Sequence, residues 1–346
     1  MKTSCRALLI LTCYDFESLQ LTLKSIEHTL DENEKVVIIL NGINTRASAL
    51  VERISRAWAN ASPANRFVVR PLCSGAKAFF AIKEVLENYQ PLAGVTHICK
   101  IDDDIIPLKR NWLDSLALGY TELSKATKVG FTTGLINNNC WGFNELLDIY
   151  DKRKEYETMF NYKTRGGAAD KFKAGEVNNG FYGTIWQEPY LGWWIHQWTT
   201  LQIESFIAKT ASLPPVEIPP ETGYSIGCLF FEKQFWLDLD HEKYQSMLDE
   251  EIIHFTCQNE KREKWAFMNE PMIHLFYFNQ RIPNRDILEA VTESLSRHFN
   301  DFSFQSLVRI NPEELMINLN ESFKTLSDDF MSFLKSLVTE PDMDQA

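Results

Sequence analysis

The sequence predicts an α/β fold: a mostly parallel β-sheet flanked by helices, with an aromatic-rich insertion and a C-terminal helical extension. Apolar runs of strand length alternate with segments of helical periodicity over the first hundred residues. Such alternation is typical of parallel strands that are covered by helices on both faces. Polar or turn-forming residues follow four of the apolar runs, and ligands of such sheets bind at the carboxyl ends of the strands.

Four strands separated by three helices are expected in this first part of the chain. The strands are expected in RALLILTCY, KVVIILNG, RFVVRPLC and THICKIDDD. The first helix is expected in ESLQLTLKSIEHTL, where Leu19, Leu23 and Ile26 recur at helical spacing. The other two are expected in NTRASALVERISRAWANA, which begins near an Asn or Thr cap, and in SGAKAFFAIKEVLENY.

The rest of the chain is less regular. A helix is expected from Asn111 to about Lys125, followed by a strand in KVGFTTGLI. The segment from Asn137 to about Thr222 lacks a long periodic pattern and is interpreted as a loop. Later residues predict a strand in YSIGCLFFEKQFW, a helix in MLDEEIIHFTCQN and one or two strands in KWAFMNEPMIHLFYF. From Arg285 to Leu337 the pattern is helical.

The composition is that of an ordinary globular protein. Of the 346 residues, 45% are apolar and 24% charged, and the formal net charge of −12 disfavours nucleic acid as a partner. No apolar run reaches the length of about 18 residues that a membrane-spanning helix needs. The N-terminal MKTSCRALLILTCYDF is interpreted as a buried strand and not as a signal peptide. The seven scattered cysteines contain no CxxC pair, and they predict reduced thiols in a cytoplasmic protein.

Three adjacent aspartates, Asp102, Asp103 and Asp104, end the fourth predicted strand. Adjacent carboxylates repel one another, so a positive group is expected beside them. Alternation along a strand would place Asp102 and Asp104 on one side and Asp103 on the other. Two carboxylates together suit a hard divalent cation that also binds substrate phosphates. The alternative interpretation is a solvated acidic loop or a helix-capping cluster.

The first 135 or so residues resemble nucleotide-sugar glycosyltransferases of the Rossmann-like GT-A type, especially family 2. The matching segments stand in the expected order: LTCYDFESLQLTLKSI, VVIILNG, RFVVRPLCSGAKAFFAIKEV and HICKIDDDIIP. The last segment resembles the strand that ends in the DxD motif of that family. The resemblance divides the chain into a nucleotide-sugar-binding half (1–136), an acceptor-side half (137–283) and a C-terminal helical extension (284–346).

The resemblance implies a donor site at the strand ends. Asp102 and Asp104 would hold Mn²⁺ or Mg²⁺ against the donor diphosphate, and Asp103 would belong to the same cofactor-binding site. The residues that would contact the nucleotide are Thr12, Tyr14 and Asp15 in the base pocket, Asn41 beside the ribose, and Lys77. Lys77 is interpreted equally well as an ordinary solvent-exposed lysine of a helix that does not contact the nucleotide.

The resemblance also implies a catalytic base at the start of a late helix. Inverting members carry an acidic pair there, and one carboxylate takes the proton of the acceptor hydroxyl. The chain reads Asp-Glu-Glu instead of the usual Glu-Asp order, so Asp249 is chosen as the base, with Glu250 as the alternative. Acidic residues also favour the first turn of any helix because of its dipole.

His274 is a candidate third metal ligand. It lies in the apolar segment EPMIHLFYF, where a histidine is usually a core residue. Enzymes of the resembled fold use a histidine at a comparable late position as a metal ligand. Together with two carboxylates, an imidazole suits Mn²⁺ better than Mg²⁺.

Two apolar regions predict interaction surfaces. Aromatic residues are dense between Phe181 and Trp198, where they would form either a platform for an acceptor sugar or a subdomain core. Trp193 and Trp194 are adjacent, so one is expected to be buried and the other exposed. The C-terminal helices are apolar on more than one face, so we expect them to pack on the core or on a second copy of the chain. Peripheral membrane association is the alternative, although this tail is not rich in Lys or Arg.

The sequence therefore predicts a metal-dependent glycosyltransferase. It would move a sugar from a nucleotide-diphosphate donor, with a UDP-sugar favoured, to a hydroxyl of a glycan or other small acceptor. A sugar-phosphate nucleotidyltransferase is one alternative, although LTCYDFESL has neither the glycine nor the lysine usual after its first strand. A non-catalytic carbohydrate-binding relative is the other.

Overall fold

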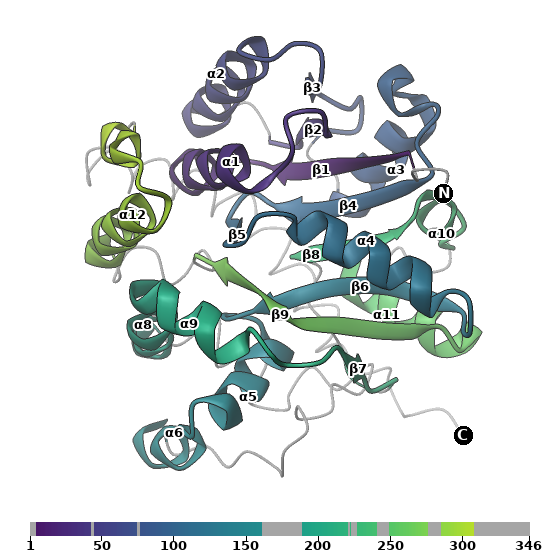
Figure 1. Ribbon diagram of the computed structural model, residues 1–346. Coiled ribbons are helices and arrows are strands. Elements are labelled where there is room, and N and C mark those ends of the chain that lie inside the picture. The colour runs from purple at the N-terminus through teal and green to yellow at the C-terminus, as the bar shows by residue number, and fades with distance from the viewer. Residues whose placement is uncertain are drawn as a thin grey trace, which may run out of the picture.

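Nine strands form a single mixed sheet in the computed structural model (Figure 1). The structure describes residues 5–42, 45–74, 77–160, 189–220, 222, 227–240, 249–275 and 285–307. Within these residues the strand order is β3-β2-β1-β4-β8-β6-β9-β5, and β7 also pairs with β9. The sheet therefore combines strands from both the early and the late parts of the chain.

The four early strands are parallel neighbours, as the sequence predicts. They are β1 (Arg6–Thr12), β2 (Lys35–Leu40), β3 (Arg66–Val69) and β4 (His97–Asp102). Thr12 lies opposite Leu40 in the register, and Leu11 lies opposite Asp102. The carboxyl ends of β1, β2 and β4 therefore meet at one edge of the sheet.

The three predicted helices between these strands are also present. They are α1 (Phe16–Thr29), α2 (Arg46–Asn60) and α3 (Ala78–Asn88). The first two begin at capping side chains, because Asp15 accepts a hydrogen bond from the Ser18 amide and Thr45 accepts one from the Ser48 amide. The caps fix where the chain leaves the sheet edge and turns into each helix.

Antiparallel pairings interrupt the second half of the sheet. The late strands are β5 (Ile105–Pro107), β6 (Val129–Ile136), β7 (Val216–Ile218), β8 (Cys228–Glu232) and β9 (Glu263–His274). β8 runs antiparallel between β4 and β6, whereas β6 and β9 are parallel to each other. β5 and β7 both pair antiparallel with β9. β6 and β9 thus end at the same edge as β1, β2 and β4.

The segment from Asn137 to Thr222 is not a loop where the structure describes it, so that interpretation is wrong. It contains α5 (Cys140–Ile149), α6 (Arg153–Phe160), α8 (Pro189–Trp198), the 3₁₀ turn η2 (Thr200–Gln202) and α9 (Ile203–Thr210). All are short, and short helices give little periodicity along a sequence. The other α-helices among the described residues are α4 (Trp112–Leu123), α10 (Lys233–Leu237), α11 (Asp249–Glu260) and α12 (Arg285–Phe299).

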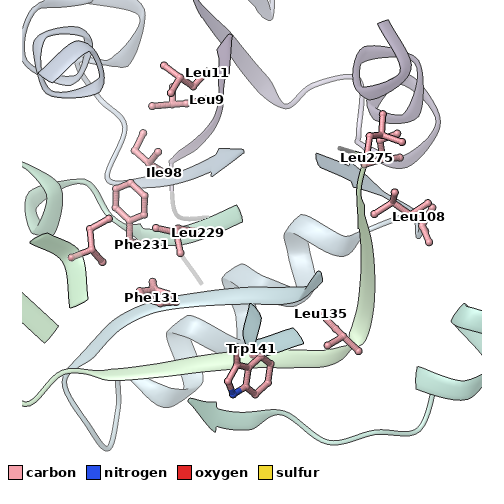
Figure 2. Packing of buried hydrophobic residues seen from close by; sticks show 14 of the residues in the cluster. Leu9, Leu11, Ile98, Leu108, Phe131, Leu135, Trp141, Leu229, Phe231 and Leu275 are labelled. Atoms are coloured by element: carbon pink, nitrogen blue, oxygen red, sulfur yellow. The ribbon is translucent and has the colours of Figure 1, made fainter. Parts of the chain in front are cut away.

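The core has two layers, one on each face of the sheet. Alternate residues of β1 enter different layers: Leu9 and Leu11 pack on one side, Leu8 and Ile10 on the other. The layer of Leu8 includes side chains from α1, α2 and α4, and the layer of Leu9 includes side chains from α3, α5, α10, α11 and α12. Figure 2 shows part of the layer that contains Leu9, where Leu9 of β1 and Leu229 of β8 line the same side of the sheet.

The described part of the C-terminal extension packs against the first helix. His28 of α1 stacks on Phe299 at 4.8 Å between ring centroids, and its Nε2 lies 2.9 Å from Asp301 Oδ2. The predicted helices beyond residue 307 lie outside the described residues. Among the described helices, none has the length and apolar character to cross a membrane. The six cysteines whose side chains the structure describes are all free thiols: Cys5, Cys13, Cys73, Cys99, Cys228 and Cys257.

Candidate active site

The aspartate cluster lies at the edge of the sheet where β4 and the strands parallel to it end. β4 ends at Asp102, and a turn at 103–104 leads directly into β5. β5 pairs antiparallel with the end of β9, so that Ile105 lies opposite His274. The strand therefore stops before Asp104, and the turn, not strand alternation, decides where the second and third carboxylates lie.

Asp104 and His274 are in direct contact. His274 Nε2 lies 3.0 Å from Asp104 Oδ2, and His274 Nδ1 lies 2.8 Å from the carbonyl oxygen of Asn138. A carbonyl only accepts, so Nδ1 carries a proton and Nε2 faces the carboxylate. Burial alone would lower the pKa of His274, but Asp104 outweighs it and raises the pKa to about 9. The structure thus brings together two of the three residues predicted to bind a metal.

Asp102, the third predicted metal ligand, is paired with a lysine. Lys100 Nζ donates a hydrogen bond to Asp102 Oδ1 at 2.5 Å, and the Lys100 side chain is fully buried. Burial raises the pKa of Asp102, although Lys100 acts in the opposite direction. The Asp102 amide donates to the carbonyl of Gly227 at 3.0 Å, which ties the cluster to the start of β8.

Asp103 binds the loop that follows β1. Thr12 Oγ1 donates to Asp103 Oδ2 at 2.5 Å, and the backbone of Cys13 donates to the same carboxylate. The Thr22 hydroxyl of α1 donates to the carbonyl oxygen of Asp103 at 2.8 Å. Burial, followed by the Asp104 carboxylate, raises the pKa of Asp103 well above its usual value. Two residues expected at the nucleotide, Thr12 and Asp103, therefore bind each other.

The other predicted nucleotide residues lie along the same edge or beside it. Asp15 caps α1 through the Ser18 amide at 3.1 Å, and Tyr14 precedes it in the loop. The Asn41 amide donates to the carbonyl of Thr12 at 2.8 Å, and its side chain is buried. Lys77 is exposed and immediately precedes α3. Gly75, in the expected turn before it, lies outside the described residues.

Asp249 and Glu250 form the start of α11. This agrees with the predicted helix and its acidic first turn. Their side chains lie outside the described part of the chain, so their role as the base stays a prediction.

The described aromatic residues of the insertion belong mostly to the core. Trp194 is buried, and its Nε1 donates to Glu155 at 2.9 Å, whereas Trp193 keeps 36% of its surface exposed. This confirms the expectation that one of the pair is buried and the other exposed. The rings of Phe181, Tyr182 and Trp186 lie outside the described residues.

The structure adds two residues to the site that the sequence argument does not include. Lys100 is recognisable in retrospect, because residues two apart on a strand share a face, and it lies two positions before Asp102. Asn137 accepts a hydrogen bond from the His274 amide, and nothing in the sequence marks it except its position at the end of a predicted strand.

Among the described residues, no three His, Cys, Asp or Glu side chains converge as a ready-made metal site. The donor set of Asp104 and His274 nevertheless fits a divalent cation. Two ligands at right angles on an octahedral ion, each about 2.1 Å from it, lie about 3.0 Å apart. In this structure the two donor atoms have this separation as hydrogen-bond partners, so a cation would take the place of the proton between them. The second nitrogen of His274 is held by a carbonyl, as is usual for a ligating histidine.

Comparisons with known proteins give matches by structure alone. No protein-family model matches the chain, and no curated protein matches it in sequence. One similar solved structure is the mannosyltransferase PcManGT from Pyrobaculum calidifontis in complex with GDP-Man and Mn²⁺, with 11% identity and a TM-score of 0.41 over 99% of this chain and 88% of that one. Two others are S. aureus TarS structures.

The TarS structures match less of their own length. The first has 11% identity and a TM-score of 0.37 over 86% of this chain, which spans only 43% of that TarS chain. The second, TarS 1–349, has 10% identity and a TM-score of 0.38 over 90% of this chain and 76% of that one. These likenesses concern the fold alone.

Proposed function

We propose that the chain is a metal-dependent glycosyltransferase that moves a sugar from a nucleotide-diphosphate donor to a hydroxyl of a glycan or other small acceptor. The observation that carries the proposal is the contact between Asp104 Oδ2 and His274 Nε2 at 3.0 Å. This pair lies at the edge where β1, β4, β6 and β9 end, which is where ligands bind in open α/β sheets.

Asp104 and His274 would hold Mn²⁺ or Mg²⁺. Both side chains are largely buried but not closed off, with 14% and 11% of their surface exposed. When bound, the cation stabilises the negative charge that develops on the departing nucleoside diphosphate. Asp102 lies beside the pair, where its second carboxylate oxygen would face the cation or the ribose.

The rest of the edge would hold the donor and activate the acceptor. Tyr14, Asp15 and Asn41 would line the nucleotide, with Lys77 at the rim. Asp249, or else Glu250, would take the proton of the acceptor hydroxyl as its oxygen bonds to the anomeric carbon. With such a base, the bond from that carbon to the diphosphate oxygen would break in the same step and the anomeric centre would be inverted. If no carboxylate lies within reach of the acceptor, a retaining mechanism applies instead.

One observation favours a second candidate function, a non-catalytic carbohydrate-binding protein. Each aspartate of the cluster has a partner within the chain: Lys100 for Asp102, Thr12 for Asp103 and His274 for Asp104. The protein itself thus reduces the repulsion that a cation would otherwise relieve. Hydrolysis of a nucleotide sugar by the purified chain would separate the two functions, because only the enzyme turns over its donor.

A thermal-shift screen of nucleotide sugars with and without Mn²⁺ tests the proposal. A UDP-sugar with Mn²⁺ is expected to raise the melting temperature by about 5 °C at roughly 100 times its dissociation constant. GDP-mannose is the comparison donor, because PcManGT was solved with it. Asp104→Ala should abolish the shift, whereas Asp238→Ala, at an exposed aspartate beyond the opposite end of β8, should retain it. Equal stabilisation by every nucleotide without metal would contradict the proposal.

A further inference from the structure

Asn137 is a fully buried polar residue directly behind the Asp104–His274 pair. Its Oδ1 accepts a hydrogen bond from the His274 backbone amide at 2.8 Å. Its Nδ2 donates to the hydroxyls of Thr199 and Thr200 at 2.9 and 3.1 Å. All four residues are buried, so each of these bonds is shielded from water.

The threonine hydroxyls fix which way the Asn137 amide faces. Thr199 Oγ1 donates its own proton to the carbonyl of Ile195 at 2.7 Å, so toward Asn137 it can only accept. The Asn137 nitrogen must therefore face the threonines, and its oxygen must face His274. The amide has one orientation in which all of its described bonds are satisfied.

Asn137 continues the strand pairing beyond the last pair of β6 and β9. The register of the two strands ends at Ile136 and Met272, and the Asn137 amide donates to the carbonyl of Met272 at 3.1 Å. The Asn137 side chain then binds the amide of His274, two residues further along β9. The next residue, Asn138, accepts from His274 Nδ1. Two consecutive asparagines thus hold the backbone and the ring of one histidine.

We propose that Asn137 is a positioning residue for divalent-cation binding: its side chain fixes the end of β9 so that His274 Nε2 faces Asp104. The inference rests on the proposed function, since the cation belongs to it. Asn137 itself does not contact the cation. Outer partners of metal ligands typically contribute 10- to 100-fold to metal affinity. Asn137→Ala is therefore expected to raise the Mn²⁺ dissociation constant about tenfold.

Asn144 supplies a matched control. Asn144, on α5, is also a buried asparagine, and its side-chain oxygen accepts a hydrogen bond from Arg153 at 2.9 Å. Removing the Asn137 side chain breaks buried hydrogen bonds and removing the Asn144 side chain breaks a partly buried one, so both alanine variants should melt at a lower temperature than the wild type. Only Asn137→Ala should weaken metal binding. If Asn137→Ala does not fold, Thr200→Val removes one acceptor of the Asn137 amide at constant volume, together with the contact of the same hydroxyl with His196 Nδ1. It should weaken Mn²⁺ binding by less than the roughly tenfold expected for Asn137→Ala.

The experiment is a titration of the full chain with Mn²⁺ alone, with free Mn²⁺ measured by electron paramagnetic resonance. The expected result is wild-type affinity for Asn144→Ala, about tenfold weaker binding for Asn137→Ala and no binding for His274→Ala. Equal affinities of the two asparagine variants would overturn the role of Asn137 and leave the proposed function standing. Failure of the wild type to bind Mn²⁺ would instead overturn the metal dependence of the proposed function, and the inference with it.

Discussion

At the scale of single residues, each aspartate of the triplet has a partner of its own. Asp102 pairs with Lys100, Asp103 with Thr12, and Asp104 with His274. The sequence predicts that something positive lies beside the carboxylates, and it identifies His274 as a candidate metal ligand. It does not predict that a buried lysine of the same strand supplies part of that charge. Alternation fails beyond Asp102 because the strand ends there.

Lys100→Met tests the contribution of the buried ion pair to stability. The variant keeps the length of the side chain but leaves the Asp102 carboxylate without its cation in a largely buried site. Because a third of the Asp102 side chain reaches solvent, we expect a loss of about 2 kcal/mol of unfolding free energy, below the full cost of breaking a buried pair. Urea denaturation of the variant and the wild type measures this difference in unfolding free energy.

The double variant Lys100→Met, Asp102→Asn is the control. Neutralising the carboxylate should recover most of the loss, because no uncompensated charge then remains. A single variant as stable as the wild type would mean that the Asp102 carboxylate is already solvated or protonated without the lysine.

At the scale of elements, long regular segments are predictable and short ones are not. The strands β1 to β4 and the helices between them follow from continuous apolar runs, helical spacing and caps. β5 and β7 have three residues each, too few for a recognisable pattern. The helices α5, α6, α8 and α9 have eight to ten residues each, and tertiary packing rather than amphipathic periodicity stabilises them.

Gly42→Ala tests how closely the ends of β1 and β2 approach each other. A Cβ atom at residue 42 would lie 2.1 Å from the carbonyl oxygen of Cys13, so the loop after β1 would have to move. We expect a loss of about 2 kcal/mol of unfolding free energy, in the range of overpacked sites. Gly94→Ala is the matched control, because nothing lies within 4 Å of a Cβ atom at residue 94. The unfolding free energy of this variant should equal that of the wild type. Equal melting temperatures for both variants would contradict the close approach.

The contact between α1 and the segment after α12 predicts a pH dependence. The Ser303 hydroxyl and amide, together with His28, hold the pKa of Asp301 at about 2, against an ordinary value of 3.8. A carboxyl whose pKa is lowered by folding stabilises the fold above its unfolded pKa. This stabilisation is lost as the pH falls from 3.8 to about 2.

Asp301→Asn should therefore destabilise the protein at neutral pH by about 1–2 kcal/mol, allowing for the 25% exposure of the side chain. The difference from the wild type should shrink between pH 4 and pH 2. Urea denaturation at several pH values measures it, with Glu122→Gln at an exposed ion pair as the control that changes little. A difference that is constant with pH would exclude the Asp301 carboxylate as its cause.

At the scale of the whole molecule, one sheet brings the site together from distant parts of the sequence. The parallel orientation of β1 to β4 follows from their alternation with helices, whereas their order in the sheet is seen only in the structure. The insertion of β8 between β4 and β6 does not, because pairings between segments far apart in the chain leave no local pattern. The same holds for the approach of His274 to Asp104, which depends on β5 pairing with the end of β9.

The proposed function requires that Asp104 and His274 together bind a divalent cation. A crystal of the full chain grown with Mn²⁺ and a nucleotide sugar, measured at the manganese absorption edge, tests it most directly. We expect an anomalous peak about 2.2 Å from both Asp104 Oδ2 and His274 Nε2, with the diphosphate on its far side. No peak at that position, with His274 Nε2 still bonded to Asp104 while the nucleotide is bound, would contradict it.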